Sequence, residues 1–349
     1  MTTPTIHIPG KVRSGQYSGA STPLDFGDVA AEFHAFTSGC AVYDLSWRAK
    51  LALTGEDRVR WLNGMVTNNV RDLLPGHGVY AFVLNPQGHI LGDIYAFYIG
   101  ETVLVDTDRS QLEKILATFD HYIIMDDVEV RELDSSLTAL GISGPRAGGV
   151  LASAGIAAPE LAPLQRMDLQ WNGIGLSLLR ADEMLPDSWQ IWLGPEHTAD
   201  VWQALATAGA TPSGADAYEL YRIARGIPRY GIDIRERDLP QETNQARALN
   251  FTKGCYVGQE IVERIRSRGK VHRLFTGFRV EGPSPAPGTK IQIDGKDVGE
   301  ITSAAVLPHA AGGQSVALGY IRREAAVGKP LQAGETHLTV AAVPFANLD

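Results

Sequence analysis

The chain has 349 residues, of which 44% are hydrophobic and 20% are charged, a composition typical of a globular protein with about two or three domains. Its 40 Asp and Glu residues outnumber the 31 Lys and Arg residues and give a net charge of −9, which argues against a general nucleic-acid coat. Only two cysteines, Cys40 and Cys255, are present, which excludes a disulfide framework and a four-cysteine zinc site. We therefore expect a reducing, cytoplasmic setting, with no export segment, no membrane contact and no direct nucleic-acid partner.

The first third of the chain alternates short strands with helices. Residues 1–22 are polar and rich in glycine and proline, which indicates an extended lead-in. Asp28 can cap a helix, and the apolar residues that follow it have helical spacing. The pattern then predicts strands at 51–54, 79–84, 90–99 and 102–105, with helices that open at Gly55 and extend over 110–119.

The middle of the chain continues in the same way. It predicts strands at 137–142, 174–179 and 190–193, and helices at 145–155, 195–209 and 215–225, the last of which ends at Gly226. Antiparallel strands mixed with helices predict the α+β class. A dinucleotide-binding fold is not expected, because no βαβ unit carries a glycine-rich phosphate loop.

The composition changes at residues 281–288, which read Glu-Gly-Pro-Ser-Pro-Ala-Pro-Gly. Short strands separated by glycine-containing turns are predicted at 274–280, 290–293, 297–304, 315–321 and 337–340. Because helical spacing is almost absent, this part is predicted to be a small all-β module, either a barrel or a sandwich.

The most unusual segment is Lys253-Gly-Cys-Tyr-Val-Gly-Gln-Glu, in which two glycines bracket an amine, a thiol and a phenol. Residues 253–273 include six Lys or Arg and two Glu, a local charge of +4. One interpretation is a charged surface helix beside a small buried cysteine. The other is a reactive thiol, Cys255, activated by Lys253 and by the N-terminus of a helix that starts near Gln259. Cys40 precedes a strand and is expected in the core.

This segment resembles the signature K-G-C-Y-x-G-Q-E of the YgfZ family of folate-binding proteins. These are relatives of the glycine cleavage T-protein, the tetrahydrofolate-dependent aminomethyltransferase. Further stretches that resemble family motifs are Tyr43-Asp-Leu-Ser-Trp-Arg, Trp61-Leu-Asn-Gly-Met-Val-Thr-Asn-Asn, and Gly226-Ile-Pro-Arg-Tyr-Gly-Ile-Asp-Ile with Pro240-Gln-Glu. The resemblance covers residues 25–349 and is weakest at 130–180 and in the final module.

The resemblance implies a fold in which α+β lobes form a cloverleaf around a folate channel and a β-barrel follows at the C-terminus. We therefore expect a lead-in at 1–22 and a T-protein-like folate-binding core at 23–272, whose two lobes divide near 135–145. The β-barrel is expected at 273–349.

The resemblance also implies site residues for tetrahydrofolate. Asp93 matches the second aspartate of the T-protein segment G-G-x-x-D-D, which lies at the reacting nitrogens of the folate, whereas Gly92 replaces the first. Tyr80 matches a tyrosine that lines the folate pocket, and Arg222 matches an arginine close to the pterin. The other candidates for cofactor binding are Met65, Tyr95, Gln190, Lys253 and Tyr256. On residue pattern alone, Tyr80, Tyr95, Met65 and Arg222 fit ordinary half-buried packing equally well, and Asp93 fits a turn or exposed-face residue.

One departure from the T-protein pattern concerns Gln190. The T-protein segment Y-T-G-E-D-G-F-E-I ends in a glutamate that pairs with the donor edge of the pterin, and here the segment is Glu183-Met-Leu-Pro-Asp-Ser-Trp-Gln-Ile. A carboxylate accepts two N–H bonds at once, whereas a carboxamide offers one acceptor oxygen. We therefore expect pterin binding that is weaker or differently oriented, which favours the YgfZ-like branch.

The leading hypothesis from the resemblance is a tetrahydrofolate-binding accessory protein that supports iron–sulfur cluster assembly or repair in client enzymes, including tRNA-modifying ones. Cys255 would be its working thiol, either in cluster handling or in guarding the folate. The clients would hold the clusters, since two cysteines are too few for the usual ligand set. The alternative is a folate-dependent aminomethyltransferase or demethylase that uses Asp93 as acid–base residue. A third possibility is a folate-binding scaffold without turnover. We expect a monomer without a metal site of its own.

Overall fold

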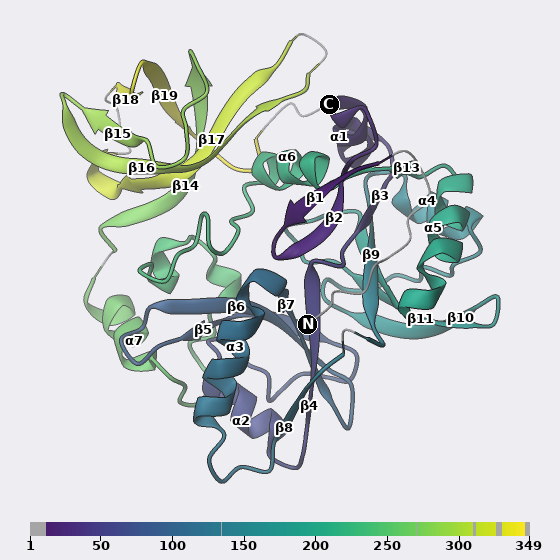
Figure 1. The fold of residues 1–349 in the computed structure, drawn as a ribbon. Coiled ribbons are helices and arrows are strands. Elements are labelled where there is room, and N and C mark those ends of the chain that lie inside the picture. Colours follow the sequence, from purple (N-terminus) through teal and green to yellow (C-terminus); the bar gives the residue numbers. More distant parts are fainter. Residues whose placement is uncertain (1–11, 134, 270, 310–311, 326–329, 346–349) are drawn as a thin grey trace. The chain divides into compact units, whose positions relative to one another are not determined.

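The computed structural model describes residues 12–133, 135–269, 271–309, 312–325 and 330–345 (Figure 1). The chain forms two compact units. The first contains the chain up to Gly64 together with Asn68–Ala81 and Ile94–Tyr218, and the second contains Met65–Thr67, Phe82–Asp93 and the chain from Glu219 onward. In the described ranges, no helix is long and apolar enough to cross a membrane.

The first unit is built on two main β-sheets. One has the strand order β5-β6-β7-β4-β8, and the other has the order β10-β11-β12-β9-β3-β13. The strands of the first sheet are β5 (Gly78–Leu84), β6 (Ile90–Tyr98), β7 (Val103–Asp108), β4 (Arg48–Thr54) and β8 (Glu129–Glu132). Residues 82–84 of β5 and 90–93 of β6 are counted with the second unit. The strands of the second are β10 (Arg166–Trp171), β11 (Ile174–Arg180), β12 (Ser188–Leu193), β9 (Thr138–Ser143), β3 (Ala41–Asp44) and β13 (Thr211–Pro212).

Helices join these strands and confirm the predicted α+β class. They are α1 (Val29–Ser38), α2 (Arg58–Met65), α3 (Arg109–Tyr122), α4 (Ala147–Ser153), the 3-10 turn Pro195–His197, α5 (Thr198–Thr207) and α6 (Ala215–Arg225). The predicted cap of α1 is confirmed, because the Asp28 carboxylate accepts hydrogen bonds from the backbone N–H groups of Ala30 and Ala31.

A two-stranded hairpin, β1 (Arg13–Tyr17) with β2 (Ala20–Asp25), precedes α1, where the sequence predicts only an extended lead-in. Residues 1–11 of that lead-in lie outside the described residues. A hydrogen bond connects the hairpin to β3: the buried hydroxyl of Thr22 donates to the Asp44 carboxylate over 2.6 Å. A contact of this kind leaves no apolar periodicity in the sequence, which explains why the pattern does not reveal the strands.

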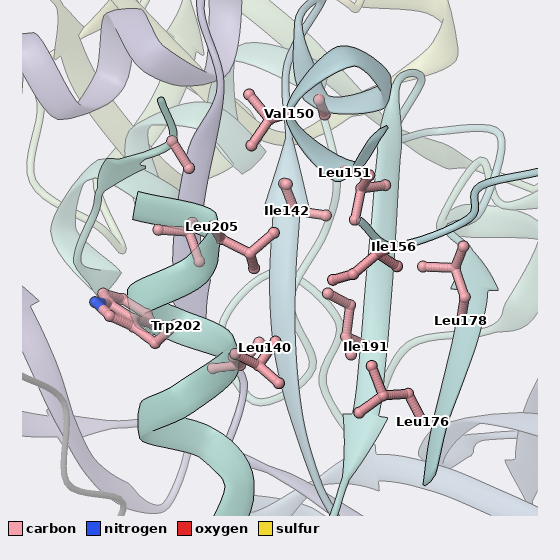
Figure 2. Close-up of a cluster of buried hydrophobic side chains, with 14 of the residues drawn as sticks. Leu140, Ile142, Val150, Leu151, Ile156, Leu176, Leu178, Ile191, Trp202 and Leu205 are labelled. Carbon is pink, nitrogen blue, oxygen red and sulfur yellow. The ribbon is translucent and has the colours of Figure 1, made fainter. Parts of the chain in front are cut away.

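A buried apolar cluster lies between one face of the second sheet and the helices α4 and α5 (Figure 2). The strands supply Leu140, Ile142, Leu176, Leu178 and Ile191, and the helices supply Val150, Leu151, Trp202 and Leu205. Cys40 belongs to the same cluster, as predicted, and burial raises the pKa of its thiol to about 12. Side chains alternate along a strand, so Ile191 faces this cluster while Gln190 and Trp192 project from the opposite face of β12.

The second unit contains α7 (Gln259–Arg268) and a closed β-barrel of strand order β14-β17-β16-β15-β18-β19. This confirms the predicted barrel and excludes the sandwich. The barrel strands are β14 (Arg273–Glu281), β15 (Lys290–Ile293), β16 (Lys296–Leu307), β17 (Gln314–Arg322), β18 (Leu331–Ala333) and β19 (Thr336–Ala341). Short 3-10 turns occur at Pro240–Glu242, Ala246–Ala248 and Arg323–Ala325.

Strands β8, β10, β13 and β18 are absent from the sequence prediction. β10 is an edge strand that carries Arg166, Asp168 and Gln170, and most of its side chains are exposed or half-buried. The residues between them, Met167, Leu169 and Trp171, pack against the apolar cluster of the second sheet, so β10 does carry a period-two signal and the prediction misses it. β8 has no fully buried side chain, and β13 and β18 have two and three residues only.

Candidate functional site

In the first unit, the predicted ligand residues Tyr80 and Tyr95 lie side by side. Tyr80 comes from β5 and is buried, and Tyr95 comes from the adjacent strand β6 and is half-buried. Their ring centroids are 4.9 Å apart with an interplanar angle of 43°. The guanidinium of Arg48 lies 5.4 Å from the centroid of the Tyr95 ring. Such a pair offers the kind of aromatic surface on which a flat heterocycle can stack.

A row of charged side chains continues from this pair across β7 and β4. Lys50 pairs with Asp106 in the strand register, and Arg48 pairs with Asp108. The Lys50 Nζ and the Arg48 Nε each lie 3.1 Å from Asp106 Oδ1, and the Arg48 Nη1 lies 2.6 Å from Asp108 Oδ1. Lys50 is wholly buried, and this burial lowers the pKa of its ammonium group.

None of these four residues is among the predicted site residues, although the sequence contains a signal for them. Arg48 and Lys50 alternate with apolar residues on β4, as Asp106 and Asp108 do around Thr107 on β7. Period-two alternation of charges in two neighbouring strands predicts a charged row when the register is known. The second oxygen of Asp106, Oδ2, is buried and has no hydrogen-bond partner within the described ranges.

Trp192 connects Gln190 to the other end of this row, at Lys50. The indole Nε1 of Trp192 donates to Gln190 Oε1 over 2.9 Å, and the Lys50 Nζ lies 5.1 Å from the centroid of the Trp192 ring. The ring of Phe97 meets the indole edge to face at 5.2 Å. The first unit therefore links three predicted ligand residues, Gln190, Tyr95 and Tyr80, through one continuous set of contacts.

In the second unit, the Cys255 loop is held by hydrogen bonds on its N-terminal side. Asn250 Oδ1 accepts from the backbone N–H groups of Thr252 at 2.9 Å and Lys253 at 3.0 Å. Cys255 itself is exposed, which excludes the interpretation of a buried packing cysteine.

Lys253 and Tyr256 pack against each other on either side of the thiol. The ammonium of Lys253 is buried, donates to the Val66 carbonyl over 2.6 Å and lies 4.9 Å from the centroid of the Tyr256 ring. Tyr256 is also buried, and burial, with a smaller contribution from the charge of Glu263, raises the pKa of its phenol to about 12. Both residues therefore stabilise the loop that presents Cys255.

The loop leads into α7, which begins at Gln259 as predicted. Gly258 has a φ of +81°, and a Cβ built there would lie 2.6 Å from the backbone oxygen of Asn85. The position therefore requires glycine, because other residues rarely adopt this conformation and would also clash. A second contact, between Gly88 and the side chain of Ile261, packs the turn before β6 against the helix.

The other predicted site residues of the second unit, Arg222, Met65 and Asp93, have different surroundings. Arg222 is buried and donates to Asp233 at 2.5 Å, to Ser303 at 2.9 Å and to Glu219. This arginine therefore connects α6 to the barrel strand β16. Met65 is buried at the end of α2, and Asp93 is half-buried on β6, two residues before Tyr95 and on the same face of the strand.

Two open hollows in the first unit have volumes of about 730 and 670 Å³. The first lies among α4, α5 and the β10–β11 turn, and the second lies at the ends of β10, β11 and β12. None of the predicted site residues lines either hollow. Within the described part of the chain, no group of three His, Cys, Asp or Glu side chains is arranged to hold a metal ion.

Comparison with known proteins extends these observations. Residues 6–253 match the family model described as the GCVT N-terminal domain, and residues 272–346 match the CAF17 C-terminal beta-barrel domain. An aminomethyltransferase from Nostoc sp. is 28% identical over 92% of this chain and 88% of its own length. A putative chloroplastic transferase from Arabidopsis thaliana is 26% identical over 95% of this chain and 76% of its own length.

Among solved structures, the glycine cleavage system aminomethyltransferase T from Bartonella henselae has the same fold. Its TM-score is 0.85 at 21% identity, over 96% of this chain and 94% of that protein. Because the GCVT model covers most of the chain and a CAF17-type barrel follows it, the chain belongs to the GCVT family as a YgfZ-type relative of aminomethyltransferase.

Proposed function

We propose that the protein binds tetrahydrofolate on the first unit and serves as an accessory protein for iron–sulfur enzymes, including tRNA-modifying ones. The observation that supports folate binding is the series of contacts that begins at Tyr80 and Tyr95 and continues through Arg48. It reaches Gln190 by way of Asp106, Lys50 and Trp192. It offers aromatic rings to a pterin and polar groups to its edge. The family assignment and the CAF17-type barrel support the accessory role.

The residues of the first unit fit a reduced folate by their chemistry. The pterin is a flat ring with a polar edge, and Tyr95 presents a half-buried ring for stacking. Asp106 Oδ2 is a buried acceptor whose hydrogen-bonding capacity is unused among the described residues. Bound tetrahydrofolate would supply the capacity to accept or protect a one-carbon unit, and these side chains would bind and orient its ring.

Calorimetry under argon with tetrahydrofolate tests this binding. Tyr95→Ala removes a stacking surface worth about 1–3 kcal/mol, so we expect its Kd to rise by about 5- to 150-fold. Tyr98→Ala is the matched control, because Tyr98 projects from the opposite face of the same strand, and it should bind as the wild type does. No saturable heat from the wild type at millimolar folate would refute folate binding.

The thiol of Cys255 would be the working group of the accessory role. It is exposed on a loop whose flanking residues are fixed by Asn250, Val66 and Gly258. A rigidly presented, solvent-accessible thiol suits reaction with a group on another protein. The +4 segment that follows it would attract an acidic partner surface or the glutamate tail of the folate.

A second candidate is one-carbon transfer by the protein itself, which the names of the aminomethyltransferase relatives favour. Asp93 would hold or move a proton in that reaction, since it shares a strand face with Tyr95. An assay with a lipoylated aminomethyl carrier decides between the two. Turnover that disappears in Asp93→Asn would replace the accessory role with this one.

A further inference from the structure

The carboxamide of Gln190 has a fixed orientation. An indole N–H is a donor and never an acceptor, so the Gln190 atom that meets Trp192 Nε1 at 2.9 Å is the oxygen. The amide nitrogen of Gln190 consequently points away from the indole. This nitrogen donates no hydrogen bond to another described residue, and the side chain is half-buried rather than exposed.

Trp192 is itself held in place from several sides. It is 1% exposed, the Phe97 ring packs against it edge to face at 5.2 Å, and the Lys50 ammonium lies 5.1 Å from its ring centroid. Lys50 is fixed in turn by its ion pair with Asp106. A buried indole in such surroundings keeps one rotamer, and the carboxamide of Gln190 therefore keeps one orientation.

We propose that Gln190 acts as a hydrogen-bond donor toward the bound ring and selects an acceptor edge, the 4-oxo group of a pterin, with Trp192 as its positioning residue. The inference rests on the proposed binding of folate. A carboxylate in this place would select the opposite edge, because it would accept from the ring N–H and amino groups. Because the oxygen of Gln190 is turned toward the indole N–H, the groups that this side chain leaves for a ligand are its amide N–H donors.

Two reduced ligands distinguish these alternatives, tetrahydrofolate and its 4-amino analogue. They differ at the ring position where one has a carbonyl acceptor and the other an amino donor. A donor from Gln190 pairs with the carbonyl but meets another donor in the analogue. Because a mismatched polar pair in a partly buried site is penalised strongly, we expect the wild type to prefer the 4-oxo ligand by at least about tenfold.

The ratio of the two Kd values, measured by calorimetry under argon, is the readout in each variant. Gln190→Glu should lower the ratio toward one, since its carboxylate accepts from the ring N–H and 2-amino group of the 4-oxo ligand as well as from the amino groups of the analogue. Trp192→Phe removes the indole N–H while keeping an aromatic ring, so the amide can turn and the ratio should fall toward one. Trp189→Phe is the matched control on the opposite face of β12, and it should keep the wild-type ratio. A ratio within one variant is insensitive to a general loss of stability.

The outcomes separate the inference from the proposed function. Firm binding of both ligands by the wild type with equal Kd values would overturn the donor role of Gln190 and leave folate binding intact. An unchanged ratio in Trp192→Phe would overturn the positioning role of the indole. Absence of binding of both ligands to folded protein would overturn folate binding and this inference together.

Discussion

Lys50 lies with its whole side chain buried, between the carboxylate of Asp106 and the ring of Trp192. Removing an ammonium group from water is costly, and the ion pair with Asp106 offsets part of that cost. Arg48 shares the same carboxylate oxygen, so the two cations and Asp106 form one network. The positions of Trp192 and Tyr95 depend on this network, because each ring lies against one of its cations.

Substitution of Lys50 tests the energy of the network. Lys50→Ala leaves a cavity and an Asp106 with Arg48 as its remaining cation, so we expect a loss of about 3–5 kcal/mol in the free energy of unfolding. Lys50→Met keeps the volume and should lose less. Urea unfolding followed by tryptophan fluorescence reports on the first unit, since all six tryptophans lie in it.

The control for this experiment is Lys114→Ala, which removes a half-buried lysine of α3 and should change stability by less than about 1 kcal/mol. Equal losses for Lys50→Ala and Lys114→Ala would show that the buried network contributes nothing special to stability.

At the scale of elements, apolar periodicity predicts most strands and helices but begins one strand too late and ends another too early. The predicted strands 51–54 and 102–105 correspond to β4 (Arg48–Thr54) and β7 (Val103–Asp108), which continue through charged residues. Those residues pair with one another across the strands, a relation that no local pattern contains. The fold class was therefore predictable from the sequence, whereas the charged frame around Tyr95 was not.

The Cys255 loop shows the same limit for a candidate site. The motif correctly marks an unusual segment and predicts the start of α7 at Gln259. The sequence suggested that the amine of Lys253 activates the thiol. Its contact with the Val66 carbonyl, which fixes the loop, joins residues far apart in the chain and is therefore not visible in the sequence. Only the fold shows that Cys255 is exposed while Lys253 and Tyr256 are buried.

The two glycines that flank Cys255 should respond differently to substitution. Gly258→Ala forces a side chain into a left-handed conformation with φ of +81° and against Asn85, so we expect a loss of more than about 1 kcal/mol. Gly254→Ala meets no atom within 4 Å and should be tolerated. Thermal unfolding measures the stability, and the rate of Cys255 with a thiol reagent measures the geometry of the loop. Similar behaviour of the two variants would contradict the assigned backbone constraint.

At the scale of the whole molecule, the chain divides into two compact units, and the second contains the barrel together with the Cys255 loop. Motif resemblance predicted the barrel, whose first strand begins at Arg273. Within this unit, Glu300 on β16 binds Arg235 at 2.5 Å and Lys290 at 2.6 Å, so it connects the segment before the barrel with two barrel strands. Such long-range ion pairs cannot be assigned from a single sequence.

Glu300 should make the stability of the second unit depend on acid pH. Burial alone would raise the pKa of this carboxyl, but its hydrogen bonds with Lys290 and Arg235 outweigh burial and lower the pKa to about 2 from an ordinary 4.5. A lowered pKa in the folded state stabilises the protein above pH 4.5, and this contribution is lost as the pH falls from 4.5 to about 2.

Urea unfolding followed by far-ultraviolet circular dichroism across this pH range measures the effect. Glu300→Gln should be less stable than the wild type at pH 6 and should approach it at the acid end. Glu281→Gln, at an exposed position of β14, should follow the wild-type profile. A Glu300→Gln profile parallel to that of the wild type would contradict the assignment.

The most direct test of the accessory role is complementation of a strain that lacks this gene, with iron–sulfur enzyme activity in extracts as the readout. Cys255→Ala should fail to restore the activity, because it removes the exposed thiol. Cys40→Ala removes the other thiol, which is buried in the core. This control should restore the activity when its protein level matches that of the wild type. Full rescue by Cys255→Ala would contradict the central claim that this thiol is the working group of the protein.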